Sequence, residues 1–332
     1  MRIIVDAYGG DHAPIEVLKG CEMAVKEYGV EVALCGREHD LRAVMSEQGI
    51  SSDGFCILEA ADVIPVEVDP TELLKTYKDS SMAVGLRSLA DGHGDAFVTA
   101  GSTGAVIVGA TLIVKRIKGV RRAAIGVVMP NPVGCYMLMD GGANSECRPE
   151  MLLQFGIMGD VYMRHIQGVD NPRVGLVNIG TEDTKGNELQ VEAHKLLQNS
   201  SLCFVGNVEA RELPLGGCDV AVADGFTGNI ILKLTEGMGK MMFTELKRML
   251  TATATAKIAA GLIKGNLADF KNRMDYTEYG GAPLMGISQP VIKAHGSSNA
   301  KAIKNAIRQA KTVREQNVIG LIGQSVSSLS QE

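Results

Sequence analysis

The chain has 332 residues, of which 45% are hydrophobic and 21% charged, so it can bury a large core and its composition excludes intrinsic disorder. Its 39 glycines and its lack of tryptophan favour an α/β protein with many tight turns over an aromatic-rich β-sandwich. A formal net charge of -5 excludes a general attraction to nucleic acid. The seven cysteines, an odd number without a C-x-x-C pair, favour a reducing cytoplasmic location over a disulfide framework or a zinc site.

Short β-branched strands recur along the chain, each followed by a glycine-rich turn and a segment with helical spacing. The first unit has a strand at residues 3–6 and a helix that begins at Pro14, a residue type that suits the first helical position. Further strands are predicted at residues 31–35, 96–99, 174–178 and 220–223. This order predicts an α/β protein with a Rossmann-like parallel sheet, in which ligands bind beyond the carboxyl ends of the strands.

Residues 123–139 are expected to form two strands joined by a Pro-Asn-Pro-Val-Gly turn. We expect this hairpin to mark a boundary within one enzyme unit spanning residues 1–332. The predicted unit has two intertwined lobes, the first made of residues 1–122 with 288–332 and the second of residues 123–287.

The glycine turns are candidate phosphate sites, because glycine lets a ligand approach the backbone and small hydroxyls accompany the predicted helix starts. For each turn alone, an ordinary strand-to-helix connection is the favoured explanation, whereas the series together shifts the balance towards a site. The arrangement requires no metal ion. The predicted binding residues are Gly9, Gly10, Asp11, Ser102, Thr103, Gly104, Asn144, Gly180, Thr227, Gly228, Ser297 and Ser298.

Several common catalytic motifs do not occur in the sequence. It contains neither the G-x-x-x-x-G-K-[ST] loop nor a G-x-G-x-x-G turn entering the first helix, which argues against a kinase and against a dinucleotide enzyme. It also lacks a G-x-S-x-G elbow and an H-E-x-x-H pair. The remaining expectation is a site for phosphate without a nucleotide.

Four longer motifs carry a family resemblance: DAYGGDHAP at residues 6–14, NIGTEDTKGNE at 178–188, DGFTGN at 224–229 and IKAHGSSNA at 292–300. With them the sequence closely resembles the PlsX family, the bacterial phosphate acyltransferases of phospholipid synthesis, from Met1 to about Arg314. The resemblance implies a three-layer α/β/α fold like that of phosphotransacetylases and of isocitrate and isopropylmalate dehydrogenases. It also implies a homodimer that converts long-chain acyl carrier protein and inorganic phosphate to acyl phosphate and free carrier protein. The sequence departs from the family pattern at Tyr8, at Gly141 and at residues 145–146.

Such a reaction needs no nucleophilic side chain, because phosphate is already an anion; the protein must supply a cation and hydrogen-bond donors. By the resemblance, Lys185 is expected to bind phosphate and Asn229 to donate to phosphate or to the carbonyl. His12 and His295, which lie in glycine turns, are candidates to bind phosphate or to protonate the leaving thiolate. The structural alternatives are a surface ion pair for Lys185, a helix N-cap for Asn229 and capping roles for the histidines. A covalent intermediate on Cys147 is a less favoured alternative.

Residues 245–273 carry a local charge of +4, from six basic and two acidic side chains, in an acidic protein. Their apolar residues follow helical spacing, which is typical of a helix that lies on anionic lipid. A helical pair that buries its apolar side in the core or in a dimer interface is an equally good interpretation. The family resemblance adds an expected peripheral contact with the membrane and with the glycerol-3-phosphate acyltransferase that uses acyl phosphate.

Two basic clusters could attract an acidic partner such as acyl carrier protein, although a solvated surface is the usual explanation of such charges. The favoured cluster is residues 115–122, and the other is the helical stripe Lys301, Lys304, Arg308 and Lys311. Two further functions compete with acyl transfer. One is a dehydrogenase on the isocitrate-like fold, which the missing dinucleotide motif opposes, and the other is a noncatalytic scaffold that binds carrier protein at a membrane. No cofactor and no nucleic acid partner are expected.

Overall fold

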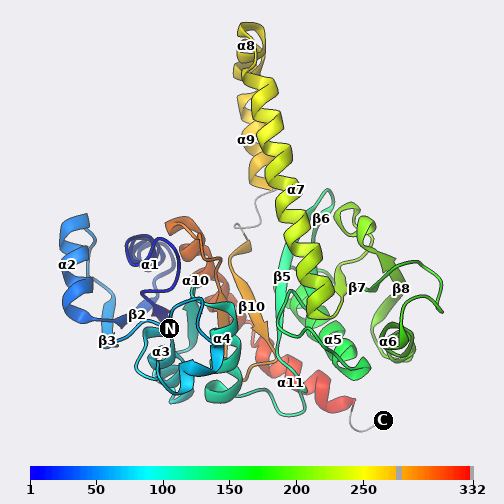
Figure 1. Cartoon of the computed structure of the whole chain (residues 1–332), viewed down its shortest axis with the longest axis horizontal. Coiled ribbons are helices and arrows are strands. Elements are labelled where there is room, and N and C mark those ends of the chain that lie inside the picture. The colour runs from blue at the N-terminus through cyan, green and yellow to red at the C-terminus, as the bar shows by residue number, and fades with distance from the viewer. Residues whose placement is uncertain (274–278, 330–332) are drawn as a thin grey trace.

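The structure is a computed structural model that describes residues 1–273 and 279–329 (Figure 1). Its elements in chain order are β1 (Arg2–Asp6), α1 (Ile15–Tyr28), β2 (Glu31–Gly36), α2 (Glu38–Gln48), β3 (Phe55–Glu59), η1 (Pro70–Leu74), α3 (Ser81–Ala90), β4 (Ala96–Thr99), α4 (Thr103–Gly109), η2 (Ala110–Val114), β5 (Ala124–Asn131), β6 (Gly134–Met139), α5 (Pro149–His165), β7 (Arg173–Asn178), α6 (Glu188–Gln198), β8 (Cys203–Glu209), η3 (Ala210–Leu215), β9 (Val220–Val222), α7 (Gly225–Thr251), α8 (Ala254–Leu262), α9 (Lys264–Arg273), β10 (Ala282–Met285), β11 (Val291–Lys293), α10 (Ala300–Glu315) and α11 (Val318–Ser328).

One sheet runs through the molecule, and in the described residues it has 11 strands in the order β3-β2-β1-β4-β11-β10-β5-β6-β9-β7-β8. The outer strands are parallel to their neighbours, as the strand-turn-helix pattern predicts. The centre is not parallel: β10 is antiparallel to β11 and to β5, and β5 is antiparallel to β6. The prediction of a parallel sheet is therefore wrong at its centre.

The hairpin predicted at residues 123–139 is confirmed as β5 and β6. Asn131 pairs with Gly134, so two residues connect the strands. So short a connection joins only antiparallel neighbours, because a parallel pair needs a long crossover. The hairpin thus reverses the strand direction, and the parallel strands of the second half run opposite to those of the first.

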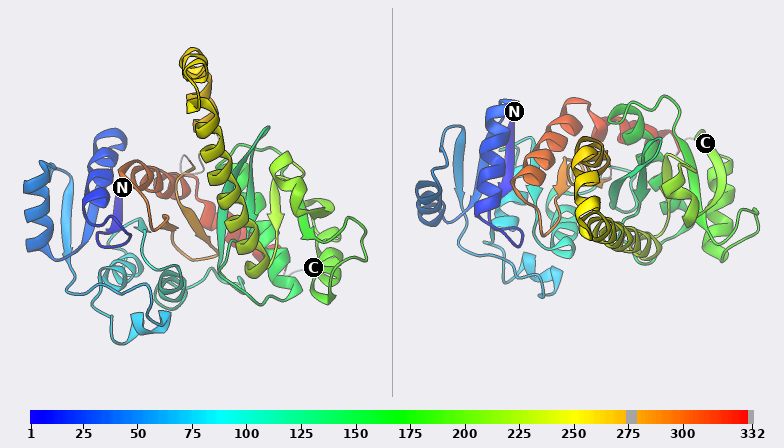
Figure 2. Two further views of the ribbon diagram at one scale, coloured as in Figure 1. Left: turned by 45° about the horizontal axis from the view of Figure 1, so that its top comes forward. Right: turned by 90° about the horizontal axis from the view of Figure 1, so that it is seen from above.

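Helices cover both faces of the sheet, which gives the expected three-layer α/β/α fold (Figure 2). Successive side chains of a strand point to opposite faces. On β1, Ile3 and Val5 pack into a core with α1, α2 and α10, whereas Ile4 packs with α3 and α4. The hairpin strand β6 behaves in the same way: Met137 and Met139 join α5 and α6, while Tyr136 and Leu138 pack toward α7.

The last elements of the chain pack against both halves of the molecule. Strand β11 pairs with β4, and α10 packs against α1, where a Cβ on Gly20 would lie 2.6 Å from Cβ of Ile303. The final helix α11 packs instead against α5, although the predicted lobe boundary groups residues 288–332 with the first lobe. The division into two lobes stays a prediction.

Helix α7 leaves the body of the molecule and, with α8 and α9, forms a projecting arm (Figure 1). Only Gly225, Gly228 and Leu232 of its 27 residues are buried, all near its start. Farther out, the rings of Phe243 and Phe270 pack with centroids 5.7 Å apart, which holds α9 against α7. The helices predicted for residues 245–273 are therefore confirmed; Met274, an apolar residue of the same pattern, lies outside the described residues. No helix within residues 1–273 and 279–329 is long and apolar enough to cross a membrane.

Candidate active site

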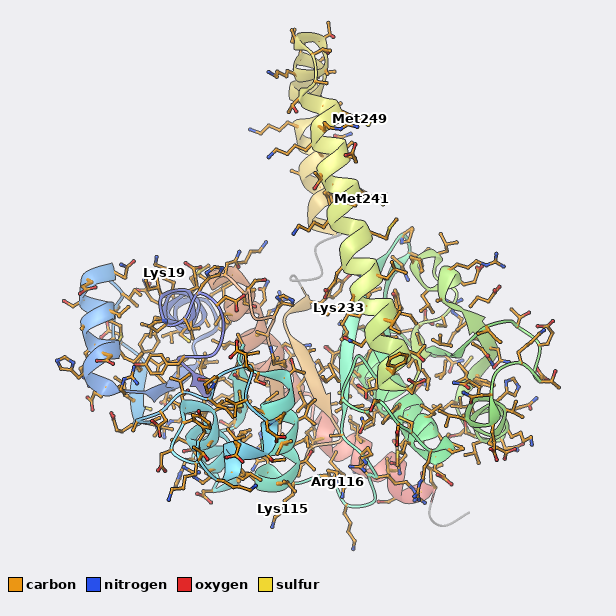
Figure 3. The ribbon with its side chains drawn as sticks, in the orientation of Figure 1. Lys19, Lys115, Arg116, Lys233, Met241 and Met249 are labelled. Carbon is orange, nitrogen blue, oxygen red and sulfur yellow. The ribbon has the colours of Figure 1, made fainter. Side chains whose placement is uncertain are left out.

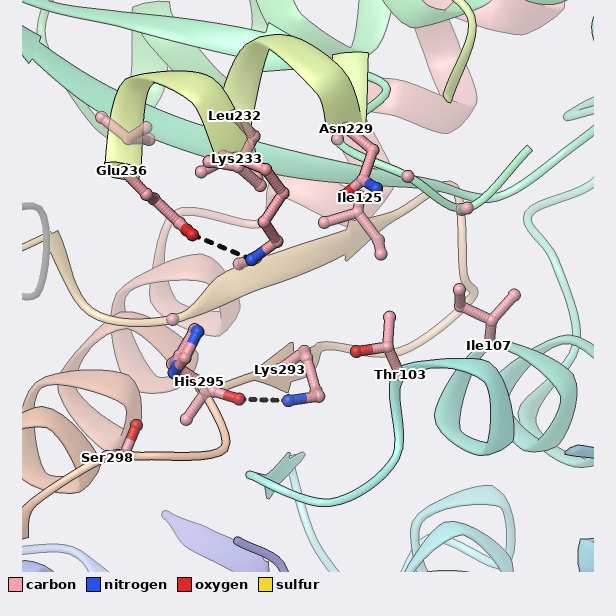
Figure 4. A pocket seen from close by; sticks show the side chains of 18 of the residues that line it. Thr103, Ile107, Ile125, Asn229, Leu232, Lys233, Glu236, Lys293, His295 and Ser298 are labelled. Atoms are coloured by element: carbon pink, nitrogen blue, oxygen red, sulfur yellow. Dashed lines mark hydrogen bonds and ion pairs between the residues drawn. The ribbon is translucent and has the colours of Figure 1, made fainter. Parts of the chain in front are cut away.

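A cavity of about 550 Å³ lies beside the central strand β5, between α4 and α7 (Figure 4). Its apolar wall is formed by aliphatic side chains from these elements: Ile107, Val108, Ile125, Val127, Val128 and Leu232. Its polar side chains are Thr103, Asn229, Lys233, Glu236, Tyr279, Lys293, His295 and Ser298. The cavity therefore combines a large apolar surface with a group of cations and hydrogen-bond donors, as sites for amphiphilic ligands do.

A second cavity of about 340 Å³ adjoins the first. It is formed mainly by the turns that follow β1 and β4, together with Gly296 after β11. Thr103 and Lys293 line both cavities, so the two spaces meet at these residues. This position beyond the carboxyl ends of β1, β4 and β11 agrees with the general rule for α/β sheets.

Asp6 holds the turns of the smaller cavity together. Its buried carboxylate accepts hydrogen bonds from the Thr99 hydroxyl at 2.7 Å and from the Tyr8 N–H at 3.2 Å, and Thr99 Oγ1 accepts the N–H of Gly101 at 2.9 Å. Burial raises the pKa of Asp6, although these hydrogen bonds oppose the shift. The Asp11 N–H donates to the Gly296 carbonyl at 2.7 Å, which joins the turns after β1 and β11.

Asp140 plays the corresponding role in the turn after β6. Its buried carboxylate accepts backbone N–H groups from Ile125, Gly142, Ala143 and Asn144 at 2.8–3.1 Å. Desolvation raises the pKa of this carboxyl group, against the effect of those bonds. The Asn144 amide donates to Asp140 at 2.8 Å and to the Ala123 carbonyl at 2.7 Å, so this predicted binding residue shapes the turn and lines neither cavity.

The start of α7 sets the position of Asn229. Asp224 caps the helix by accepting the Thr227 N–H at 2.9 Å and the Thr227 hydroxyl at 2.8 Å, so the N-cap interpretation of Asn229 is wrong. Gly228 lets the helix contact the turn after β6, since a Cβ there would lie 1.9 Å from the Asp140 carbonyl oxygen. Thr227 and Gly228 therefore place the helix, while Asn229 itself lines the larger cavity.

Two lysines in the larger cavity were not predicted from the sequence. Lys233 lies one turn after Asn229 on α7, and its Nζ is 2.9 Å from Oε2 of Glu236, a third lining residue that the sequence did not single out. Lys293 ends β11 and is only 9% exposed. Its Nζ donates to the carbonyls of Ala294 and, at 3.4 Å, Ala100.

Burial lowers the pKa of Lys293 to about 8, helped by the positive charge of Lys233 and opposed by Asp6 and Asp11. Its signal in the sequence is a charged residue at the end of the short apolar run Val291–Lys293, directly before the AHGSSN turn.

His295 follows Lys293 and lines the same cavity. Its Nδ1 accepts the Ser297 backbone N–H at 3.2 Å and lies 2.8 Å from the Ser297 hydroxyl. Because a backbone N–H can only donate, this contact assigns the proton of the neutral ring to Nε2. Ser297 thus orients His295 and lines neither cavity, whereas Ser298 lines the larger one.

The predicted residues fall into four groups, of which three belong to the cavities or their walls. The larger cavity is lined by Thr103, Gly104, Asn229, His295 and Ser298, and the smaller by Gly9, Gly10, Asp11, Ser102 and Thr103. Asn144, Thr227, Gly228 and Ser297 support these walls through the contacts described above.

Lys185, Gly180 and His12 line neither cavity. Lys185 lies on the turn after β7, where its Nζ is 3.8 Å from Glu182 and its side chain is 47% exposed. His12 is exposed just before α1. The catalytic roles expected for Lys185 and His12 stay predictions.

A covalent intermediate on Cys147 finds little support in the site. Burial raises the pKa of Cys147 to about 12, so its thiol is poorly suited to accept an acyl group, and it lines neither cavity. In the part of the chain that the structure describes, no three His, Cys, Asp or Glu side chains are grouped to hold a metal ion.

Residues 1–321 match the family model described as fatty acid synthesis protein. The chain belongs to this family, the PlsX family. It is 44% identical over 332 residues to a phosphate acyltransferase of Thermoanaerobacterium thermosaccharolyticum, covering 100% of this chain and 98% of that protein. A phosphate acyltransferase of Clostridium botulinum is 43% identical over 330 residues, with 99% and 98% covered. This PlsX-family chain is accordingly an acyltransferase, as the resemblance predicted.

Solved structures with the same fold come from more distant proteins. A phosphotransacetylase from Streptococcus pyogenes has a TM-score of 0.65 at 17% identity, covering 98% of this chain and 94% of that one. The EutD phosphotransacetylase from Staphylococcus aureus has a TM-score of 0.63 at 16% identity, with 95% and 94% covered. These similarities confirm the fold expected for the PlsX family.

Proposed function

We propose that this phosphate acyltransferase transfers a long-chain acyl group from acyl carrier protein to inorganic phosphate, giving acyl phosphate for phosphatidic acid and phospholipid synthesis. The observation that carries the proposal is the composition of the larger cavity. The aliphatic wall of this cavity suits a long acyl chain. In the same space, Asn229, Lys233 and His295 supply hydrogen-bond donors and a cation. A dinucleotide or a sugar would leave much of that apolar wall without a partner.

The reaction requires one bond to form and one to break. An oxygen of monohydrogen phosphate attacks the thioester carbon, the carbon–sulfur bond breaks, and the proton of the phosphate ends on the carrier thiol. The Asn229 amide is suited to donate to the carbonyl oxygen as it becomes negative. The Nε2–H of His295, fixed by Ser297, is suited to donate to the developing thiolate or to a phosphate oxygen.

The experiment is to measure thioester loss from palmitoyl carrier protein with and without inorganic phosphate, trapping acyl phosphate with hydroxylamine. We expect loss only with phosphate, together with trapped product. A nicotinamide-dependent change in absorbance would favour the dehydrogenase instead. Binding of carrier protein or lipid without any turnover would favour the scaffold.

A second copy of the chain is the partner proposed for α7. Exposed apolar side chains recur on α7 at about every fourth residue, on a side away from buried Leu232: Phe226, Ile230, Leu234, Met238, Met241 and Met242. Such a continuous apolar face on a projecting helix is typical of an interface. Replacement of Ile230 and Met238 by glutamate should convert a dimer to a monomer in sedimentation velocity experiments.

The tip of the arm is proposed to contact anionic lipid. Ile258 and Leu262 are 67% and 84% exposed there, with Lys257 and Lys264 beside them, and α8 has no buried residue. Figure 3 labels Met241 and Met249 on the part of α7 that projects from the body toward this tip. A surface position would allow acyl phosphate to pass directly to the glycerol-3-phosphate acyltransferase that is proposed to use it.

Acyl carrier protein is proposed to dock on the basic cluster of residues 115–122. Lys115, Arg116, Lys118, Arg121 and Arg122 are all exposed on this loop, at the end of the molecule away from the arm (Figure 3). By contrast, Lys304 and Lys311 of the other stripe form ion pairs with Glu27 and Glu315. The double variant Lys115→Glu with Lys118→Glu should have a higher KM for the carrier thioester, and this KM should depend less on salt concentration.

A further inference from the structure

Lys293 is in an unusual environment for a lysine. It is 9% exposed, and in the described part of the chain its ammonium has two backbone carbonyls as partners and no carboxylate within ion-pair distance. Buried cations are normally paired, because desolvation of an isolated charge is costly. Because Lys293 also lines both cavities, an anion from solution could take the place of the missing carboxylate partner.

The backbone around Lys293 is rigid. Lys293 pairs with Thr99 of β4 on one side and with Ala282 of β10 on the other. Its side chain reaches the junction of the two cavities, next to Thr103 (Figure 4). A charge held on a doubly paired strand needs little reorganisation when a ligand binds, which is the property that an anion site in an enzyme requires.

We propose that Lys293 is a catalytic residue that binds the attacking phosphate where the two cavities meet. The inference rests on the proposed acyl transfer to phosphate. The ammonium keeps its proton and donates to a non-attacking phosphate oxygen, with the Thr103 hydroxyl as a second donor. Phosphate binds at the junction of the two cavities, and the acyl thioester occupies the larger one, so that the attacking oxygen meets the carbonyl carbon there.

The charges around the site favour this division. Lys233 on α7 adds a second positive charge toward Lys293 from the larger cavity, whereas Asp6 and Asp11 lie on the side of the smaller one. The carboxylates resist an anion deep in the smaller cavity, and the cations attract it to the junction. The pKa of Lys293, lowered to about 8 by burial, still leaves most of the lysine charged at neutral pH.

The first test measures phosphate binding without turnover. The unfolding temperature of the wild type should rise with inorganic phosphate at constant ionic strength, compared with potassium chloride. Lys293→Met and Lys293→Gln should lose this rise. Lys195→Met, which removes a surface lysine on α6 that is 61% exposed, should keep it.

The second test measures turnover of palmitoyl carrier protein. The KM for phosphate should increase about ten- to a hundredfold in the Lys293 variants, the usual loss for a hydrogen bond to a charged group. The KM for the carrier thioester should stay unchanged. If the variants keep both the wild-type phosphate KM and the thermal response, Lys293 does not bind phosphate. An inactive wild type would instead contradict the proposed function, whatever the variants do.

The wild type alone provides a third measurement if neither variant folds. Reductive methylation at pH 8 should modify Lys293 more slowly in the presence of phosphate, as measured by mass spectrometry of its peptide. Methylation of Lys195 should not respond to phosphate. Equal rates at Lys293 with and without phosphate would overturn the inference.

Discussion

Lys233 and Lys293 line one cavity from different halves of the molecule (Figure 4). Burial lowers the pKa of Lys293, and the positive charge of Lys233 adds to that shift. Lys233 comes from the helix after β9, and Lys293 from the last strand of the chain. Glu236 offsets part of the Lys233 charge through an ion pair at 2.9 Å. The site thus gathers positive charge only when both halves of the sheet are folded together.

The stability of the protein should depend on pH through Lys293. An unfolded lysine has a pKa of about 10.4, whereas the folded value is about 8, so between these pH values the unfolded chain binds more protons. The free energy of unfolding should therefore rise with pH in this window, by up to about 3 kcal/mol from this group. Urea unfolding of wild type and Lys293→Met at pH 7.5 and 10 isolates the effect. A difference between the two proteins that does not change with pH would contradict the prediction.

Asn229→Ala should lower kcat about 10²- to 10³-fold, the loss expected when one donor to a developing oxyanion is removed. The KM for phosphate should change much less, because the proposed role of Asn229 is at the carbonyl. Phosphate-dependent release of carrier thiol is the measurement. Asn266→Ala, at an exposed position of α9, is the matched control and should keep the wild-type rate. A similar loss in both variants would point to an effect unrelated to the carbonyl.

Gly228→Ala should destabilise the protein by about 1–3 kcal/mol or more, as overpacking against a rigid neighbour does. The new Cβ would lie 1.9 Å from the Asp140 carbonyl oxygen, so α7 must move and carry Asn229 away from its position. Activity should fall together with stability in chemical denaturation. Gly239→Ala is the control on the same helix: its Cβ meets nothing within 4 Å, and we expect a gain of about 0.5–1 kcal/mol there. Equal stability changes at the two positions would refute the close contact.

Ile258→Glu with Leu262→Glu should weaken binding to vesicles of anionic phospholipid at least about tenfold, since each change removes an apolar side chain that is proposed to enter the lipid interface. Turnover of carrier thioester in solution should not change. Leu215→Glu, at a 68% exposed position of η3, should leave vesicle binding intact. Cosedimentation that is equal for the double variant and the wild type would rule out the tip as the lipid contact.

Much of the fold could be predicted from local patterns. The strands at residues 3–6, 31–35, 96–99, 174–178 and 220–223 have β-branched runs followed by turns, and each coincides with a strand of the structure. The sequence prediction misses four strands of the described residues, β3, β8, β10 and β11. Of these, β10 and β11 have four and three residues, too few to show a period. They are strands only because β4 and β5 offer edges on both sides of them, which is a tertiary effect.

The site was harder to predict, because the glycine turns look alike in the sequence. Strand order decides which of them meet: β4, β11 and β10 are neighbours, so Ser102 and His295 come close to one site. Strand β7 is separated from the centre by β9 and β6, and Lys185 on its turn is correspondingly distant from the cavities. Lys293 lies within the motif at residues 292–300, but the sequence assigns it no role because it belongs to a strand rather than to a turn.

The pairing of β11 with β4 has a consequence for synthesis on the ribosome. Strand β4 ends at Thr99, and its partner at Val291–Lys293 emerges only after residues 100–290 have been translated. Until then the nascent first half has an open strand edge, which other chains can pair with and aggregate. The segment that begins at Val291 therefore both closes that edge and delivers the lysine on which phosphate binding is proposed to depend, so an incompletely translated chain is at once exposed and inactive.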